Sequence, residues 1–167
     1  MHARFLLPLI AAWLLAGCGD SGPQGIPRGE LAPDFVAQRL EGGKVNFPSD
    51  YRGRAVVLRF WAGWCPYCNR EMREIEPIYQ RLKGQGLEVL AVNVAQTPKL
   101  VRKFVEDTKI SYPVLLDENG RIARRYGVIG LPHTYFIDRK GRVQGKVVGE
   151  TPGEVFEREA QKLLRTQ

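Results

Sequence analysis

The middle of the chain carries two largely apolar runs, 55–61 and 87–94, separated by a stretch with helical periodicity. The second run favours a strand buried on both faces, as in parallel sheets. Between the runs, Met72, Ile75 and Leu82 recur at the spacing of an amphipathic helix, which we expect to begin at Pro66. Pro77 lies inside this pattern and is predicted to kink or break the helix.

The pattern further along the chain continues this alternation. It predicts helices over 98–108, 121–126 and 152–164, and extended segments over 112–117, 134–138 and 143–148. The last two strands are joined by a link of hairpin length. Early strand–helix alternation favours parallel strands with crossover helices, and the hairpin favours an antiparallel edge. We therefore predict an α/β fold with a mixed central sheet and helices on both faces.

The N-terminus carries a short apolar segment, 5–16, preceded by Arg4. It is too short to span a bilayer and fits the core of a signal peptide. The segment ends in Leu-Ala-Gly-Cys, which resembles the bacterial lipobox and implies cleavage before Cys18 and lipidation of its sulfur. An ordinary secretory signal is the alternative. We divide the chain into a signal peptide (1–17), a Gly/Pro-rich flexible tether (18–30) and one domain (31–167).

The chain is basic, with a formal net charge of +7, but its Lys and Arg residues are interspersed with Asp and Glu. In an exported protein this pattern argues against nucleic acid as a partner. It fits a solvated surface or an attraction to anionic lipid headgroups.

The sequence Trp64-Cys65-Pro66-Tyr67-Cys68 follows the first apolar run directly. A thiol at the first turn of a helix ionises easily, and a second thiol three residues on can reach it, as reversible disulfide exchange requires. A bridge closing so small a loop stabilises little, which argues against a purely structural role. A zinc site would need further ligands, and the chain's two histidines are His2 and His133. We therefore predict no metal.

Two segments resemble known motifs. The segment 60–68 is similar to the active-site segment of the thioredoxin superfamily, and 130–138 to its cis-proline segment. The start 32–35 and the insertion between 82 and 117 resemble the TlpA/ResA/DsbE-type branch of membrane-attached bacterial thiol–disulfide oxidoreductases. The resemblance implies a thioredoxin-like fold with an N-terminal extension and a central insertion, and a cis peptide bond before Pro132.

The resemblance also implies roles for individual residues. Cys65 is expected to be the nucleophile and Cys68 the resolving thiol. His133 is expected either to lie near the sulfurs, as a thiolate partner or a Cu(I) ligand, or to be a bystander. The residues expected to bind substrate or tune the pair are Trp64, Pro66, Tyr67, Leu131, Pro132 and His133.

Two positions depart from the family pattern. Arg59 stands where many thioredoxins carry a buried Asp, and Gln96 where ResA-type proteins carry a Glu, so neither position supplies a carboxylate as proton acceptor. Arg59 pointing toward the sulfurs would stabilise a thiolate and make the disulfide a stronger oxidant, whereas pointing outward it would do neither. Gln96 could orient a water.

The sequence thus predicts an exported, lipid-anchored oxidoreductase without a cofactor. Its favoured reaction is reduction of disulfides in exported proteins, with electrons from a membrane donor of the DsbD/CcdA type. By resemblance, the clients are cytochrome c haem-attachment cysteines or copper-site cysteines. The alternatives are a disulfide oxidase or isomerase using the same residues, a Cu(I) metallochaperone using Cys65, Cys68 and His133, and an inert adaptor.

Overall fold

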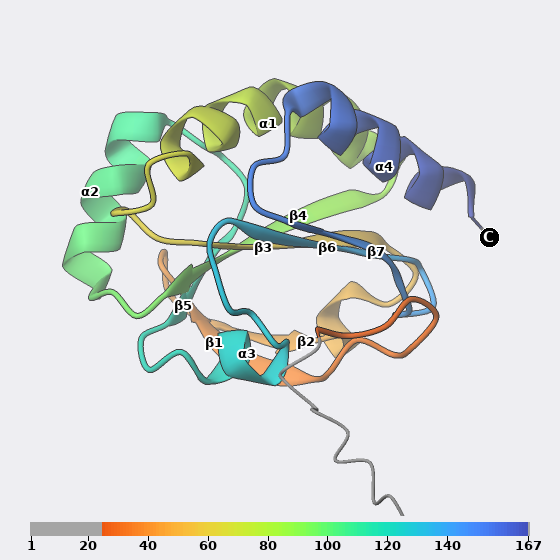
Figure 1. Cartoon of the computed structure of the whole chain (residues 1–167), viewed down its shortest axis with the longest axis horizontal. Coiled ribbons are helices and arrows are strands. Elements are labelled where there is room, and N and C mark those ends of the chain that lie inside the picture. The colour runs from red at the N-terminus through yellow and green to blue at the C-terminus, as the bar shows by residue number, and fades with distance from the viewer. Residues whose placement is uncertain (1–24, 167) are drawn as a thin grey trace, which may run out of the picture.

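The computed structural model describes residues 25–166, which form a seven-stranded sheet flanked by helices (Figure 1). The strand order is β2-β1-β5-β4-β3-β6-β7. The strands are β1 Phe35–Arg39, β2 Lys44–Phe47, β3 Ala55–Trp61, β4 Leu87–Val94, β5 Val114–Asp117, β6 His133–Ile137 and β7 Val143–Val148. The helices are α1 Cys68–Leu82, α2 Pro98–Thr108, α3 Arg121–Arg125 and α4 Gly153–Arg165, with 3-10 turns at Ser49–Tyr51 and Lys83–Gln85.

The sheet is mixed, as predicted. β3, β4 and β5 are parallel neighbours connected through α1 and α2, whereas β6 and β7 form an antiparallel hairpin at the β3 edge. The β1–β2 hairpin, which pairs antiparallel with β5 and extends the other edge, was not predicted from the sequence. Its two strands are only five and four residues long, so the alternation of buried and exposed residues is too short to stand out in the sequence.

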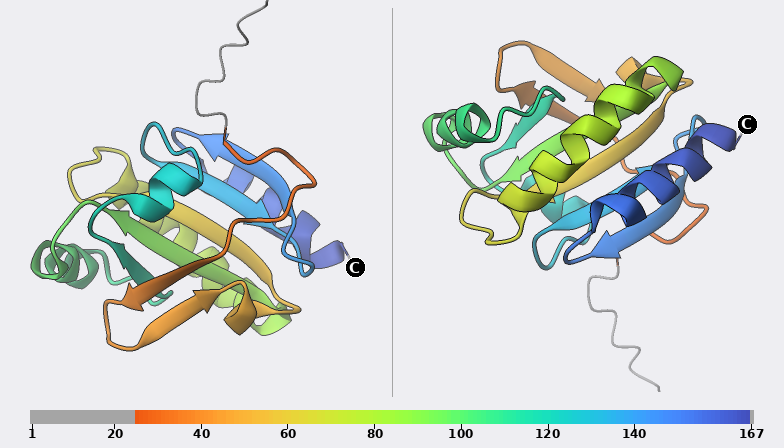
Figure 2. Two further views of the ribbon diagram at one scale, coloured as in Figure 1. Left: turned by 90° about the horizontal axis from the view of Figure 1, so that it is seen from below. Right: turned by 90° about the horizontal axis from the view of Figure 1, so that it is seen from above.

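Alternate side chains of β3 enter two separate hydrophobic layers. Val57 and Trp61 pack with α1 and α4, which cover the upper face of the sheet in Figure 1. Leu58 and Phe60 pack on the other face, which carries α3. Figure 2 shows these two faces from below and from above. Every residue of β3 is buried because both faces are covered.

The helix α1 differs from its prediction in two respects. It begins at Cys68 rather than Pro66, after a turn in which the Cys68 N–H donates to the Cys65 carbonyl (3.2 Å). It also continues without a break through Pro77. Pro77 and Arg73, whose carbonyl would accept the missing N–H, both lie on the exposed side of α1. The buried stripe around Ile75 and Ile78 holds the helix on the sheet.

The domain begins earlier than predicted, because residues 25–30, assigned to the tether, pack on it. The Gly29 N–H donates to the Val143 carbonyl (2.7 Å), and the Val143 N–H donates to the Glu30 carbonyl (2.9 Å). Such backbone pairing leaves no side-chain pattern in the sequence. The predicted signal peptide and Cys18 lie outside the described residues. Within residues 25–166, no helix has the length and apolar character needed to cross a bilayer.

Candidate active site

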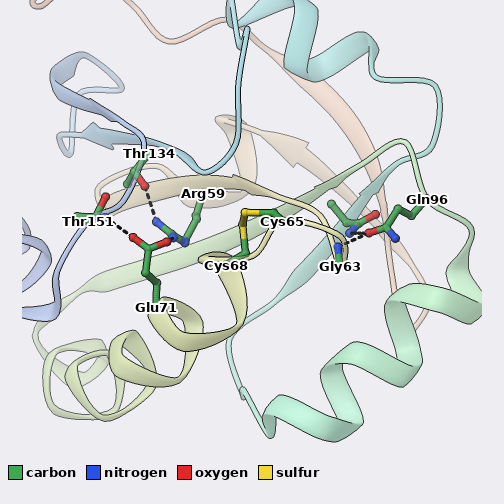
Figure 3. Close-up of a disulfide and its surroundings, with 9 residues drawn as sticks. Arg59, Gly63, Cys65, Cys68, Glu71, Gln96, Thr134 and Thr151 are labelled. Carbon is green, nitrogen blue, oxygen red and sulfur yellow. Dashed lines mark hydrogen bonds and ion pairs between the residues drawn. A yellow bond between two sulfur atoms is a disulfide. The ribbon is translucent and has the colours of Figure 1, made fainter.

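A disulfide between Cys65 and Cys68 lies where the loop after β3 enters α1 (Figure 3). Both cysteines are buried in the layer beneath α1. Two aromatic side chains flank them at the surface: Trp64 is 67% exposed and Tyr67 is 50% exposed. The site is therefore a covered disulfide with an exposed aromatic rim, at a helix N-terminus that favours a thiolate.

The Leu131–Pro132 peptide bond is cis, as the resemblance predicted. β6 begins directly after this bond and pairs with β3, with His133 opposite Phe60. The Gly149 N–H donates to the Pro132 carbonyl (2.8 Å), which ties the segment to the end of β7. Pro132 therefore enters the sheet on the strand next to the one that leads to the cysteines, and Leu131 packs against both hydrophobic layers.

Arg59 neither offers a free positive charge to the sulfurs nor points to solvent. It is fully buried, and its guanidinium donates to Thr134 Oγ1 (2.8 Å) and to Glu71 Oε2 (Figure 3). Burial lowers the pKa of Arg59, and the Glu71 carboxylate opposes that shift. Because Glu71 balances its charge, Arg59 does not act as the uncompensated cation that would make the disulfide a stronger oxidant.

Glu71 is the site residue that the sequence analysis missed. Its second oxygen accepts the Thr151 backbone N–H, so both carboxylate oxygens are engaged. Glu71 follows Cys68 by three residues, which places both on one face of α1. The buried stripe of α1 includes Glu71, and Arg59 is the single charge in the buried run of β3. Two opposite charges inside apolar patterns, one in the run 55–61 and one at the helical spacing of Ile75, Ile78 and Leu82, were the signal that could have revealed this pair.

Gln96 holds the loop that precedes the cysteines. Its Oε1 accepts the Gly63 N–H (2.5 Å) and the Asn93 Nδ2 (2.9 Å). Ala95 has a left-handed backbone conformation (φ 57°), which turns the chain after β4 toward this loop. The side-chain oxygen of Gln96 is thus bonded to two protein donors, which gives it a positioning role for this loop.

Of the two alternatives for His133, the structure favours the bystander, because His133 lies on the face of the sheet opposite to the layer of the disulfide. β6 directs Thr134 toward Arg59 and its neighbour His133 to the other side, where it stacks on Tyr135 (ring centroids 4.9 Å apart). His133 is 2% exposed, and burial, with a smaller effect of Lys146, lowers its pKa to about 4. Within residues 25–166, no cluster of three His, Cys, Asp or Glu side chains could hold a metal ion.

The sheet topology, the Cys65–Cys68 disulfide at the start of α1 and the cis bond before Pro132 together define a thioredoxin-like thiol–disulfide oxidoreductase. The sequence model of the AhpC/TSA family matches residues 28–146. The chain belongs to this family, within its branch of ResA-like thiol–disulfide oxidoreductases.

Individual relatives agree with this assignment. The chain is 36% identical over 135 residues to the thiol-disulfide oxidoreductase ResA of Bacillus thuringiensis, covering 81% of this chain and 78% of the relative. It is 43% identical over 124 residues to ResA of Geobacillus thermodenitrificans, covering 72% and 69%. A crystal structure from Chlorobium tepidum, of a candidate thiol:disulfide interchange protein DsbE, matches with a TM-score of 0.78 and 33% identity, covering 83% of this chain and 99% of that one.

Proposed function

We propose that this protein is exported, anchored by a lipid on Cys18, and reduces disulfides in other exported proteins. The observation that carries the proposal is the Cys65–Cys68 pair, held as a disulfide at the start of α1 beneath exposed Trp64 and Tyr67. A client peptide can dock on this aromatic rim, and the backbone before Pro132 offers extended pairing. No cofactor is needed because both electrons reside in the dithiol.

The proposed cycle balances without a further reactant. The Cys65 thiolate attacks one sulfur of the client disulfide, forming a mixed disulfide and releasing the other client sulfur as a thiolate that takes up a proton. Cys68 then loses its proton and attacks Cys65, releasing the second client thiolate and leaving the Cys65–Cys68 disulfide. A membrane dithiol donor of the DsbD/CcdA type reduces this disulfide and becomes oxidised itself.

Haem-attachment cysteines of apocytochromes c and copper-site cysteines are the proposed clients. Both kinds of cysteine must be reduced before they can take up their ligand in an oxidising compartment. A disulfide oxidase with the same residues would run the cycle in the opposite direction. The balanced Arg59–Glu71 pair favours the reductase, since no uncompensated cation from this pair stabilises the thiolate form.

The reduction potential of the Cys65–Cys68 couple, measured by equilibration in thiol buffers, tests the direction. A value near that of thioredoxin, about −270 mV, supports a reductase that needs a membrane electron donor. A value near that of DsbA, about −120 mV, would make the protein a disulfide donor and overturn the proposed direction.

A further inference from the structure

The described chain begins at Gly25, on the face of the sheet that carries α3. A Cβ added to Gly25 would lie 2.3 Å from Tyr135 Oη and 3.2 Å from Lys146 Nζ, and the Ile26 N–H donates to Tyr135 Oη (3.1 Å). Cys18, the proposed lipid attachment site, precedes Gly25 by seven residues. Seven residues span at most about 25 Å when fully extended, so the anchor would keep this face close to the membrane surface.

Exposed basic side chains surround this starting point. α3 contributes three arginines and is followed by Tyr126, whose carbonyl lies beside Gly25. The Arg142 guanidinium donates to the Gly29 carbonyl (2.8 Å), four residues after the start. We call this set the basic face, and its members are Arg28, Arg121, Arg124, Arg125, Arg142 and Lys146.

The charges of the basic face are largely unbalanced. Within residues 25–166, Arg125 is its one member with an ion-pair partner, Asp34 at 2.5 Å. The exposed acids Glu30 and Glu118 neighbour these cations in sequence, and the buried Asp138 accepts the Arg142 backbone N–H (2.9 Å). With Asp34, this leaves six basic groups against four acidic ones. The face formed by α1 and α4 has more of its cations paired with acids: Arg70 with Glu150, Arg81 with Glu157, and Arg158 and Lys162 with Glu159, while Arg73, Lys83 and Arg165 have no ion-pair partner within residues 25–166.

We propose that the basic face docks on the anionic lipid headgroups of the membrane to which the chain is tethered. The inference rests on the proposed lipid anchor. Lys and Arg side chains are attracted to an anionic leaflet within a Debye length, about 8 Å at physiological ionic strength. A tether of seven residues spans at most about 25 Å, so it keeps the cations within about three Debye lengths of the surface and raises their effective concentration there.

Docking of this face would orient the redox site. α3 and the start of the described chain lie on one side of the sheet, and α1 and α4 lie on the other (Figure 2). The Cys65–Cys68 disulfide belongs to the layer under α1, so the docked domain presents its redox site away from the lipid, where clients have access.

The test uses the full chain, recovered from bacterial membranes and reconstituted in vesicles of phosphatidylcholine, alone or in an equimolar mixture with phosphatidylglycerol. An amine-reactive reagent labels Lys146 on the basic face and Lys99 on exposed α2, and peptide mass spectrometry quantifies both. We expect Lys146 labelling to fall at least about threefold on the anionic vesicles alone, and molar salt to restore it by screening. Lys99 labelling should stay unchanged.

Matched variants separate this effect from a general charge effect. Arg121→Gln with Arg124→Gln removes two unpaired charges of the basic face and should restore much of the Lys146 labelling. Lys99→Gln with Lys103→Gln removes two charges from α2 and should leave Lys146 protected. If Lys146 is labelled equally on both vesicle types while the protein still sediments with them, the docking proposal is overturned and the lipid anchor is retained. Failure to sediment with either vesicle type overturns both.

Discussion

His133 shows how one residue position in a strand decides the chemistry of a side chain. Its place after Pro132 suggested a neighbour of the sulfurs, but strand alternation turns it to the opposite layer. There it is buried, stacked on Tyr135 and close enough to Lys146 for that charge to oppose protonation. A histidine whose pKa is lowered to about 4 is neutral at physiological pH, so it acts in packing.

His133 should make the fold less stable in acid. Its pKa is about 4 in the folded protein and near 6.5 in the unfolded chain, so the unfolded chain takes up the proton first as the pH falls. The stability that the neutral, buried His133 contributes to the fold is fully present above pH 6.5 and is lost as the pH falls toward 4. Between pH 7 and pH 5, the free energy of unfolding should fall by about 2 kcal/mol more in the wild type than in His133→Phe.

Urea unfolding at a series of pH values measures this difference, because all other titrating groups are shared by the two proteins. His133→Gln provides a second neutral side chain if the larger ring disturbs packing. Parallel pH curves for the wild type and both variants would show that His133 does not titrate in this range.

At the scale of elements, the Arg59–Glu71 pair joins the parts of the fold that frame the disulfide. Arg59 comes from β3 and Glu71 from α1, while their further partners, Thr134 and Thr151, come from β6 and the turn before α4. A buried ion pair need not add stability over apolar residues, but either partner left alone is costly. The pair therefore fixes the position of α1 on the sheet at the turn of the helix that follows Cys68.

Removing one partner should destabilise the protein strongly. Arg59→Met leaves the Glu71 carboxylate buried without a counter-ion and should lower the free energy of unfolding by about 3–5 kcal/mol. Arg59→Met combined with Glu71→Leu removes both charges and should recover most of that loss. Arg81→Met is the matched control, because the Arg81–Glu157 pair is solvent-exposed and worth at most about 1 kcal/mol. Urea titration would contradict the argument if Arg59→Met cost no more than Arg81→Met.

For the whole molecule, the sheet separates two functions. The layer with α1 and α4 holds the redox pair, and the layer with α3 receives the incoming chain and carries the basic face. The aromatic rim formed by Trp64 and Tyr67 is a surface that a client protein can approach, because both side chains are exposed.

Cys68→Ser should trap clients, because the mixed disulfide on Cys65 then lacks its resolving thiol. Cells that produce this variant should contain adducts that disappear on reduction, detected by non-reducing electrophoresis and identified by mass spectrometry. The double variant Cys65→Ser with Cys68→Ser should form none. A folded, reduced Cys68→Ser protein without adducts would count against exchange chemistry at this pair.

Local patterns in the sequence determined most of the architecture. The bounds of β4, α2 and β7 match the prediction, since each is marked by a strong apolar pattern or a clear start and stop. The cysteine pair was evident from the CxxC spacing after a buried strand, and the resemblance predicted the cis bond before Pro132. These features depend on residues close together in the chain.

Tertiary structure decided what depends on residues far apart. Arg59 and Glu71 are 12 positions apart, and Thr134 and Thr151 are more distant, so their network exists only once α1 and β6 pack around β3. The side to which His133 points depends on the register of β6 against β3, because a shift of one residue reverses every side chain. The packing of residues 25–30 depends on backbone hydrogen bonds to β7, and backbone groups are the same in every sequence.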